Sequence, residues 1–401
     1  MSDPLKSRNE ANYASARDTE YGDIVYEEEW LFSQRTKRVI IAISVIASIF
    51  FVYLFCVLLP KMFIPELRPL EGIVMVQDLP VSLDPVDPQT AAEWNVGDWK
   101  VADNGDEESD DEKEPEATTS RKKIGKLKER LILVGDIHGQ LKEFKKLLGK
   151  IKYNQEKDHL LVLGDFITKG RDSIGVLELL DEYNADCILG NHEYYVLNNY
   201  ARFHGLDSPF FVAENSTVPF RSLLVSPSGF IEDPEYLLAK KLQPEHIAYI
   251  NKCLLIKKLG PVPLHSSRNN GKRKHADGLA VHAGLRLDAL DNLNEQEPMD
   301  CLEMRSYLAP HFNETTDDPH EKNAVSWSKV WNAKQKEGSL DHEYIVYYGH
   351  DARRGVKLKK WAKGLDSGCV RGDQLSAMVI WQEKTPKGHV LYKEQVVSVN
   401  C

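Results

Sequence analysis

Five short motifs, in a fixed order along the 401 residues, most constrain how this chain can fold. Each motif follows a short apolar run, which is where a buried strand would end and a loop would begin. Each carries carboxylate, amide or imidazole side chains, usually beside glycine. A layered α/β protein brings such loops together at the carboxyl ends of its strands. The motifs are Gly135-Asp136-Ile137-His138-Gly139, Gly164-Asp165, Gly190-Asn191-His192-Glu193, Val281-His282-Ala283-Gly284-Leu285 and Tyr348-Gly349-His350-Asp351.

Strand and helix patterns alternate around these motifs, which predicts an α/β fold over residues 129–401. Between residues 200 and 278 the alternation breaks into segments punctuated by proline, and we expect an inserted helical cap there. The patterned segments are strands over 131–134, 159–163 and 187–189 and helices over 141–151 and 173–183.

Residues 39–59 form an uncharged apolar segment that is long enough to span a membrane as a helix. The segment is too long, and starts too far from Met1, for a cleaved signal peptide. Arg35, Lys37 and Arg38 precede it. The positive-inside rule therefore predicts a single-pass membrane protein with a cytoplasmic amino terminus and a lumenal or external carboxy-terminal part.

Composition divides the rest of the chain into a tail, a linker and one domain. Residues 1–38 are polar and predict a disordered tail, while residues 60–128 are rich in proline and acidic side chains and predict a solvated linker. The glycosylation acceptor triplets that begin at Asn215 and Asn313 agree with a lumenal location of residues 129–401.

Net charge and cysteine spacing exclude some classes of function. A net charge of -10 argues against broad binding to nucleic acid. The six cysteines have no CxxC pair and no regular spacing. This pattern favours neither a thiolate zinc site nor a disulfide framework, and we expect each cysteine to be a small core residue. The oligomeric state is not constrained.

The motif side chains are suited to bind two divalent metal ions. Asp136 and His138 alternate along an extended backbone, so both would reach a first ion, and Asp165 would bridge to a second. Each has another interpretation when taken singly, because Asn191 also fits a helix N-cap and a lone histidine is usually structural. The expected metal ligands are Asp136, His138, Asp165, Asn191, His282 and His350.

This ligand set predicts cleavage of phosphate bonds. A hydroxide formed between the two metals would attack phosphorus in line with the leaving oxygen. His192 is adjacent to a ligand but is not needed as one, so it is the candidate acid that protonates the leaving group. The absence of thiolates leaves manganese and iron as acceptable metals.

The ordered set resembles the metallophosphoesterases of the phosphoprotein-phosphatase superfamily, and within them the ApaH-like phosphatases. The likeness spans residues 131–380, and its specific parts are residues 164–170, 348–355 and 365–370. It implies a four-layer α/β/β/α sandwich and a division of the ligands between two metals. By this resemblance the first metal is bound by Asp136, His138 and Asp165, and the second by Asp165, Asn191, His282 and His350.

The chain departs from the protein Ser/Thr phosphatases at two positions. Those enzymes carry Asp and Arg where this chain has Thr168 and Lys169, and that Asp orients the catalytic histidine. Threonine supplies no carboxylate, so His192 must be oriented differently or act more weakly. Lys169 keeps a cation near the phosphate but lacks the guanidinium fork of arginine.

The basic side chains near the motifs exceed what one small phosphomonoester needs, and they predict a polyanionic substrate. The alternative is that they only solvate the surface. Arg371 stands where ApaH-like sequences often have a bulky aromatic residue, which argues against stacking of a nucleobase. The candidate substrate-binding residues are Lys169, Arg171, Arg353, Arg354 and Arg371.

Fungal vacuolar membrane polyphosphatases of this family are similar along their whole length, with a short cytoplasmic tail, one span and a lumenal catalytic domain. This likeness implies zinc or cobalt and a vacuole membrane. We therefore expect a membrane-anchored, two-metal hydrolase of phosphoanhydride bonds, with inorganic polyphosphate as the first substrate. The alternatives are a protein Ser/Thr phosphatase, a dinucleoside polyphosphate hydrolase and a non-enzymatic membrane scaffold.

Overall fold

A computed structural model describes residues 33–63, 67–94, 126–217, 221–222, 233–264 and 275–401. Nearly all of the predicted tail and the acidic part of the predicted linker lie outside these residues. The chain divides into two compact units, Met1–Ile64 and Pro65–Cys401, and each is described by itself.

The first unit is helical throughout its described part. Ser33 caps the first helix, because its Oγ accepts a hydrogen bond from the backbone N–H of Thr36 at 3.1 Å. The helical segment Gln34–Leu58 contains an 18-residue window with a mean hydropathy of 2.8, and none of its residues is buried, so it is a candidate membrane span. The consecutive elements are α1 (Gln34–Tyr53), η1 (Leu54–Leu58) and α2 (Leu59–Phe63).

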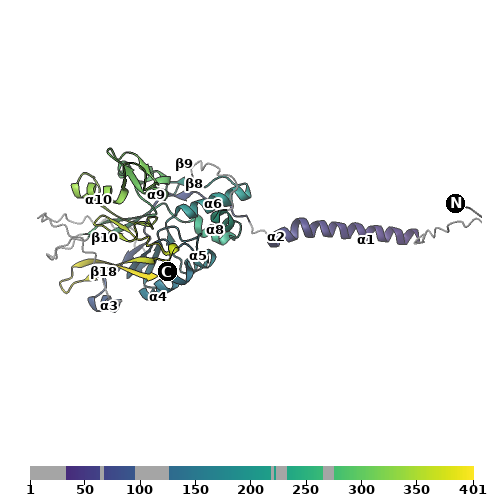
Figure 1. Ribbon diagram of the computed structural model, residues 1–401. Coiled ribbons are helices and arrows are strands. Elements are labelled where there is room, and N and C mark those ends of the chain that lie inside the picture. Colours follow the sequence, from purple (N-terminus) through teal and green to yellow (C-terminus); the bar gives the residue numbers. More distant parts are fainter. Residues whose placement is uncertain (1–32, 64–66, 95–125, 218–220, 223–232, 265–274) are drawn as a thin grey trace, which may run out of the picture. The chain divides into compact units, whose positions relative to one another are not determined.

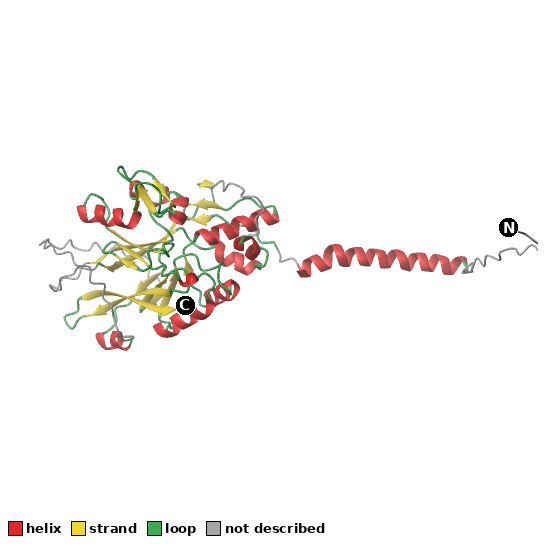
Figure 2. Ribbon diagram, viewed as in Figure 1, coloured by secondary structure: helices red, strands yellow, loops and turns green. Residues whose placement is uncertain are grey.

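The second unit contains two large mixed sheets (Figures 1 and 2). One has the strand order β19-β18-β5-β6-β7, and the other has the order β16-β17-β15-β11-β10-β2. The first consists of β5 (Arg130–Val134), β6 (Asp158–Val162), β7 (Asp186–Cys187), β18 (Gln374–Lys384) and β19 (Val390–Asn400). The second consists of β2 (Val76–Asp78), β10 (Ile256–Pro263), β11 (His275–Val281), β15 (Tyr344–Tyr348), β16 (Lys357–Leu358) and β17 (Ala362–Gly364).

Helices cover the outer faces of the two sheets. Helix α4 (Leu141–Ile151) contacts β18 and β19, strand β19 contacts β10 of the other sheet, and α10 (Trp327–Glu337) contacts β17. This order of helix, sheet, sheet and helix confirms the predicted four-layer sandwich. Helix α4 buries Phe144, Leu147, Leu148 and Ile151, whose spacing places them on one face.

Parallel pairing places the motif loops at neighbouring strand ends. Strand β5 is parallel to β6, with Val134 opposite Val162, and β6 is parallel to β7. In the other sheet β11 is parallel to β15. The loops that follow these strands carry the five motifs, as the apolar runs predicted.

The predicted linker is wrong over residues 67–94, because these residues contribute elements to the second unit. Ile73, Met75 and Val76 are buried in its core. The strands involved are too short for a clear periodic pattern, and each pairs with a strand that is distant in the sequence. The elements are β1 (Ile73–Val74), which pairs with β8 (Phe210–Val212), β2, which pairs with β10, β3 (Val81–Leu83), which pairs with β4 (Lys126–Lys128), and α3 (Pro88–Glu93).

The insertion expected over residues 200–278 is narrower than predicted, because β10 and the start of β11 belong to the six-stranded sheet. Its described elements are the end of α6 (Asn191–His204), β8, β9 (Arg221–Ser222), α7 (Pro234–Ala239) and α8 (Pro244–Asn251). The other elements are α5 (Ser173–Glu182), α9 (Pro298–Glu303), β12 (Ser306–Leu308), β13 (Thr315–Thr316), β14 (Ala324–Ser326), η2 (Leu287–Ala289), η3 (Leu293–Glu295) and η4 (Cys369–Arg371).

The cysteine prediction is also wrong, because four of the six cysteines form disulfides. Cys187 pairs with Cys253, and Cys369 pairs with the last residue, Cys401. The partners are 66 and 32 residues apart, so only the fold brings them together. Cys301 is a buried free thiol, as expected for a core residue.

Candidate metal centre

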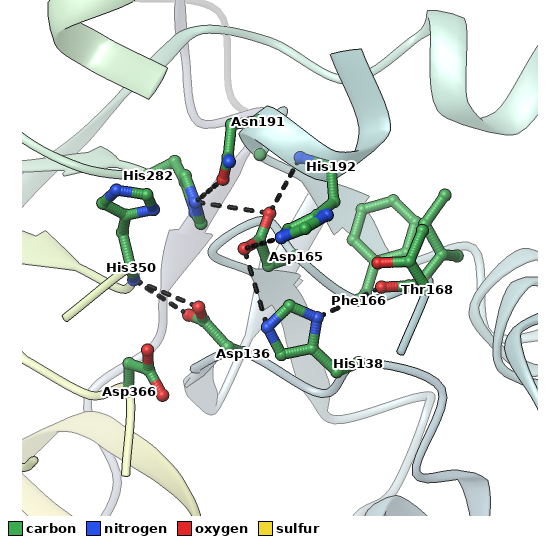
Figure 3. Close-up of polar contacts among 12 residues, drawn as sticks. Asp136, His138, Asp165, Phe166, Thr168, Asn191, His192, His282, His350 and Asp366 are labelled. Atoms are coloured by element: carbon green, nitrogen blue, oxygen red, sulfur yellow. Dashed lines mark hydrogen bonds and ion pairs between the residues drawn. The ribbon is translucent and has the colours of Figure 1, made fainter. Parts of the chain in front are cut away.

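The structure brings all six predicted metal ligands to one place at the strand ends (Figure 3). The two sheets supply them jointly, since three ligands follow strands of the five-stranded sheet and two follow strands of the six-stranded sheet. Asp136 and His138 follow β5, Asp165 follows β6, Asn191 begins α6, His282 follows β11 and His350 follows β15.

Asp165 lies at the centre of this arrangement. Its Oδ1 is 3.4 Å from Nε2 of His282, and its Oδ2 is 3.7 Å from Nε2 of His138. Two groups of potential ligands share this carboxylate, and in each the ligand atoms lie within 4.8 Å of one another. The first group is His138, Asp165 and His192, and the second is Asp165, His282 and His350. A carboxylate shared by two groups is suited to bridge two ions.

Backbone carbonyls orient the three histidine ligands. His282 donates its Nδ1–H to the carbonyl of Leu163 at 2.7 Å, and His138 donates its Nδ1–H to the carbonyl of Ile167 at 3.3 Å. His350 donates its Nε2–H to the carbonyl of Glu303 at 3.1 Å. In the neutral form of each ring the other nitrogen is then unprotonated and available to a metal, which is the usual arrangement of metal-binding histidines.

Two motif glycines leave the space that this arrangement needs. A Cβ atom at Gly349 would lie 2.1 Å from Oδ1 of Asp136, and one at Gly164 would lie 2.5 Å from Nδ1 of His282. Side chains at these positions would displace the ligands. The backbone of three ligands is also left-handed, with φ of 46° at His138, 49° at Asp165 and 61° at His350. Such backbone strain concentrates at functional sites.

Glu193 holds the loop that carries Asp165, a role that sequence reasoning missed. Its fully buried carboxylate accepts hydrogen bonds from the backbone N–H groups of Asp165 at 2.7 Å, Phe166 at 3.0 Å, Ile167 at 3.1 Å and Gly190 at 3.0 Å. Burial raises the pKa of Glu193 to about 7. Its place in the third motif was the only signal for this role.

Asp366 is a second missed residue, and it adds a carboxylate beside Asp136. Burial raises the pKa of Asp136 well above its usual value, and the neighbouring charges of Asp366 and Asp165 raise it further. Burial also favours the neutral form of Asp165, but the imidazoles of His282 and His192 outweigh it and hold the pKa of Asp165 well below its usual range. Divalent cations would neutralise this concentration of buried carboxylates, so the donor set fits two metals.

His192, the predicted acid, lies on the first turn of α6 at the edge of the centre. Its backbone N–H donates to Oδ1 of Asp165 at 3.2 Å, and its Nε2 lies 3.8 Å from Oδ2 of the same carboxylate. Its ring also meets that of His138 edge to face, with centroids 5.1 Å apart. His192 is therefore close enough to the ligands to reach a group bound there, and its role as acid stays a prediction.

The predicted substrate-binding cations differ in their surroundings. Lys169 is exposed, and its charge opposes protonation of His138 and His192, which places it close to the centre. Arg354 donates to Asp351 at 2.6 Å and is half-buried. Sequence reasoning missed Arg305, which donates to the carbonyl of His350 at 3.3 Å. The remaining predicted cations, Arg171, Arg353 and Arg371, are exposed.

Comparison with known proteins gives relatives that are named as a polyphosphatase and as bis(5'-nucleosyl)-tetraphosphatases. The zinc-dependent endopolyphosphatase of Saccharomyces cerevisiae is 28% identical over 289 residues, which cover 69% of this chain and 82% of that protein. The symmetrical bis(5'-nucleosyl)-tetraphosphatase of Buchnera aphidicola is 28% identical over 284 residues, covering 63% of this chain and 95% of that protein. A solved structure provisionally named a diadenosine tetraphosphatase covers 67% of this chain and 94% of its own, with 24% identity and a TM-score of 0.46.

The family match covers the part of the chain that carries the site. Residues 129–354 match the calcineurin-like phosphoesterases, and they make up more than half of the 401 residues and include all six predicted ligands. The resemblance found in the motifs is thereby confirmed. This chain belongs to the calcineurin-like phosphoesterase family and is a metal-dependent phosphohydrolase.

Proposed function

We propose that this phosphohydrolase is anchored in a membrane by the helix Gln34–Leu58 and that it hydrolyses the phosphoanhydride bonds of inorganic polyphosphate. The observation that supports this substrate is the similarity to the yeast zinc-dependent endopolyphosphatase, which extends over 82% of that protein. Zinc is accordingly the first candidate metal, and cobalt, manganese and iron remain open for a set of imidazole and oxygen ligands.

Exposed cations that follow the predicted metal ligands in the sequence support a polyanionic substrate. Lys169, Arg171, Arg353 and Arg371 all expose their side chains in the described structure. Arg371 also donates to the carbonyl of Ala352, next to Arg353, so two cations of this set come from adjoining loops. Cations on several loops suit a chain of phosphates better than a single phosphate group.

In this proposal each part of the site has a separate task. Bound metals would lower the pKa of water and polarise the phosphoryl oxygens. Asp165 would contribute to both metals, and Asp136, His138, Asn191, His282 and His350 would complete the ligand set. His192 donates a proton from Nε2 to the oxygen that leaves phosphorus, and the exposed cations hold the neighbouring phosphates.

We further propose that the amino terminus is cytoplasmic and that the second unit is lumenal, in the vacuole. Arg35, Lys37 and Arg38 lie at the amino-terminal end of the helix. The two disulfides favour an oxidising compartment for the second unit. Asn215 and Asn313 are both exposed, as glycosylated residues would need to be. A glycosidase-sensitive mass shift, lost in Asn215→Gln together with Asn313→Gln, tests this orientation, and cleavage of the second unit by protease outside intact vacuoles contradicts it.

A dinucleoside polyphosphate hydrolase is the second candidate, because the bis(5'-nucleosyl)-tetraphosphatase similarity covers 95% of that relative. The test uses the purified full chain in detergent with zinc, cobalt, manganese or iron. Long-chain polyphosphate, diadenosine tetraphosphate and a phosphopeptide are compared by kcat/KM, with Asp165→Asn as the inactive control. Gel analysis of polyphosphate length separates internal from terminal cleavage. A higher kcat/KM for diadenosine tetraphosphate or for the phosphopeptide than for polyphosphate contradicts the proposal.

A further inference from the structure

A carboxylate from the inserted segment meets the ring of His192. Oε1 of Glu235 is in hydrogen-bond contact with Nδ1 of His192, although the two residues lie 43 positions apart. Both side chains are largely buried, with 14% exposure for His192 and 10% for Glu235. A buried carboxylate needs a hydrogen-bond or charged partner, and this imidazole supplies it.

Glu235 is itself held in place by its helix. Pro234 occupies the first turn of α7, and Asp233 caps the helix by accepting a hydrogen bond from the backbone N–H of Tyr236 at 2.7 Å. Helix α7 packs against α6, whose first turn carries His192. The carboxylate therefore comes from a capped helix turn rather than from a free loop.

This contact fixes which ring nitrogen of His192 faces the metal centre. Nδ1–H donates to Glu235, so Nε2 points to the opposite side of the ring, where Oδ2 of Asp165 lies at 3.8 Å. The histidine ligands differ from His192 in this respect, because backbone carbonyls orient all three of them. Thr168, the position at which sequence analysis noted a missing carboxylate, has no hydrogen-bond partner for its hydroxyl among the described residues.

We propose that Glu235 is the positioning residue of the acid His192, holding Nε2 toward the oxygen that leaves phosphorus. Glu235 exchanges no proton with the substrate and acts only through His192. The inference rests on the proposed role of His192 and deepens it. It does not depend on which phosphate compound is the natural substrate.

The test compares variants of the full chain, purified in detergent and loaded with zinc, on whichever phosphate compound of the substrate panel is cleaved fastest. The variants are Glu235→Gln, Glu235→Asp, His192→Asn and the double variant His192→Asn with Glu235→Gln. Glu245→Gln is the matched control, because Glu245 also follows a proline at the start of a short helix, α8, but is exposed.

We expect Glu235→Gln to lower kcat roughly 10- to 100-fold, with little change in KM and with unchanged bound zinc, because it removes the group that orients an acid. Glu235→Asp should recover part of kcat, and Glu245→Gln should match the wild type. The double variant should be no slower than His192→Asn alone, because residues that act as a unit are not additive.

A second readout does not involve activity. In protein labelled with ¹⁵N-histidine, the ring nitrogens of His192 should show Nδ1 as the protonated nitrogen in the neutral ring, and Glu235→Gln should give a mixture of both tautomers. An unchanged tautomer together with an unchanged kcat overturns the proposal.

Other outcomes distinguish failure of this inference from failure of the proposed function. Equal losses from Glu235→Gln in the wild-type and His192→Asn backgrounds overturn the inference, because Glu235 would then act independently of His192. Loss of bound zinc in Glu235→Gln also overturns it in favour of a structural role. If His192→Asn retains full kcat, the role of His192 and this inference both fail. If polyphosphate is not cleaved but another phosphate compound shows the expected pattern, only the substrate assignment fails.

Discussion

The Asp186→Asn substitution tests how the strand that leads to Asn191 is held. Oδ2 of Asp186 contacts Nζ of Lys257, which is buried, and lies 3.0 Å from Nε2 of His159. Asp186 is in β7, His159 in β6 and Lys257 in β10. The cluster therefore joins the five-stranded sheet to the six-stranded sheet.

The pKa of Asp186 gives the size of the effect. Burial favours its neutral form, but the hydrogen bond with His159 and the charge of Lys257 outweigh burial and lower the pKa from 3.8 to about 2. A difference of ~1.8 units corresponds to about 2.4 kcal/mol of folding stability. Because the folded-state pKa is lowered, this stability is present above pH ~3.8 and is lost as the pH falls through ~2. Removing the carboxylate also leaves Lys257 buried without this partner, which raises the expected loss at pH 7 to about 3–5 kcal/mol.

Urea unfolding of the full chain in detergent, followed by tryptophan fluorescence, measures the loss. The control is Asp181→Asn, since Asp181 is 64% exposed and lies 3.7 Å from Lys252 in a surface ion pair. Such a pair contributes no more than about 1 kcal/mol. The difference between wild type and Asp186→Asn should shrink as the pH is lowered toward 3. A loss no larger than that of Asp181→Asn, or one that does not change with pH, refutes the reasoning.

Three further predictions concern the metal centre and its surroundings. Asp165→Asn should lose bound metal and at least about 10³-fold of kcat/KM, because it removes the carboxylate charge shared by both groups of predicted ligands. Metal analysis and circular dichroism check this, and a variant with full metal content contradicts it. Removing the Cys187–Cys253 disulfide by serine substitution should cost about 4 kcal/mol in urea unfolding, because the bridge closes a long loop of the unfolded chain, and an unchanged unfolding midpoint contradicts this. Lys169→Ala should raise the KM for long-chain polyphosphate severalfold in steady-state assays. The control Lys145→Ala, on the exposed face of α4, should leave this KM unchanged. Equal KM values for the two variants contradict a contact between Lys169 and the substrate.

The clustering of the six predicted metal ligands could be predicted because their signal is local. Each lies within a few residues of a buried strand, and the order of strand, loop and polar side chain is written in consecutive residues. The helix over 141–151 was predicted with the bounds that α4 has, because its apolar residues repeat with helical spacing. Both cases need only a short window of sequence.

The features that were wrong or missed depend on contacts between distant segments. Strand β1 has two residues, and its pairing with β8 joins residues 73 and 211, so no periodic pattern marks it. The disulfide partners Cys369 and Cys401 meet because the last strand returns along β18. The spacing of residues in a single sequence does not show which distant segments pair in the fold.

Glu193, Asp366 and Glu235 show a further limit, because each supports the site through a different kind of contact. Glu193 binds backbone N–H groups, which every side chain except that of proline would leave in place at those positions, and Asp366 lies against Asp136, which is distant in the sequence. Glu235 contacts a motif side chain, but it comes from an insertion whose length separates it from His192.

The way in which each histidine is oriented distinguishes the three predicted ligands from the proposed acid. Backbone carbonyls at Leu163, Ile167 and Glu303 hold the three ligand rings, and a carbonyl is present whatever side chain the position carries. Ligand geometry is therefore insensitive to most substitutions in these supporting positions. His192 is held by a side chain instead, so a single substitution at Glu235 can change its orientation while the metal ligands keep theirs. The leaving groups of different phosphate compounds differ in how much they need a proton donor, whereas the need for two metals is the same. An acid that is oriented separately from the metal ligands is therefore useful in a family whose members act on different phosphate compounds.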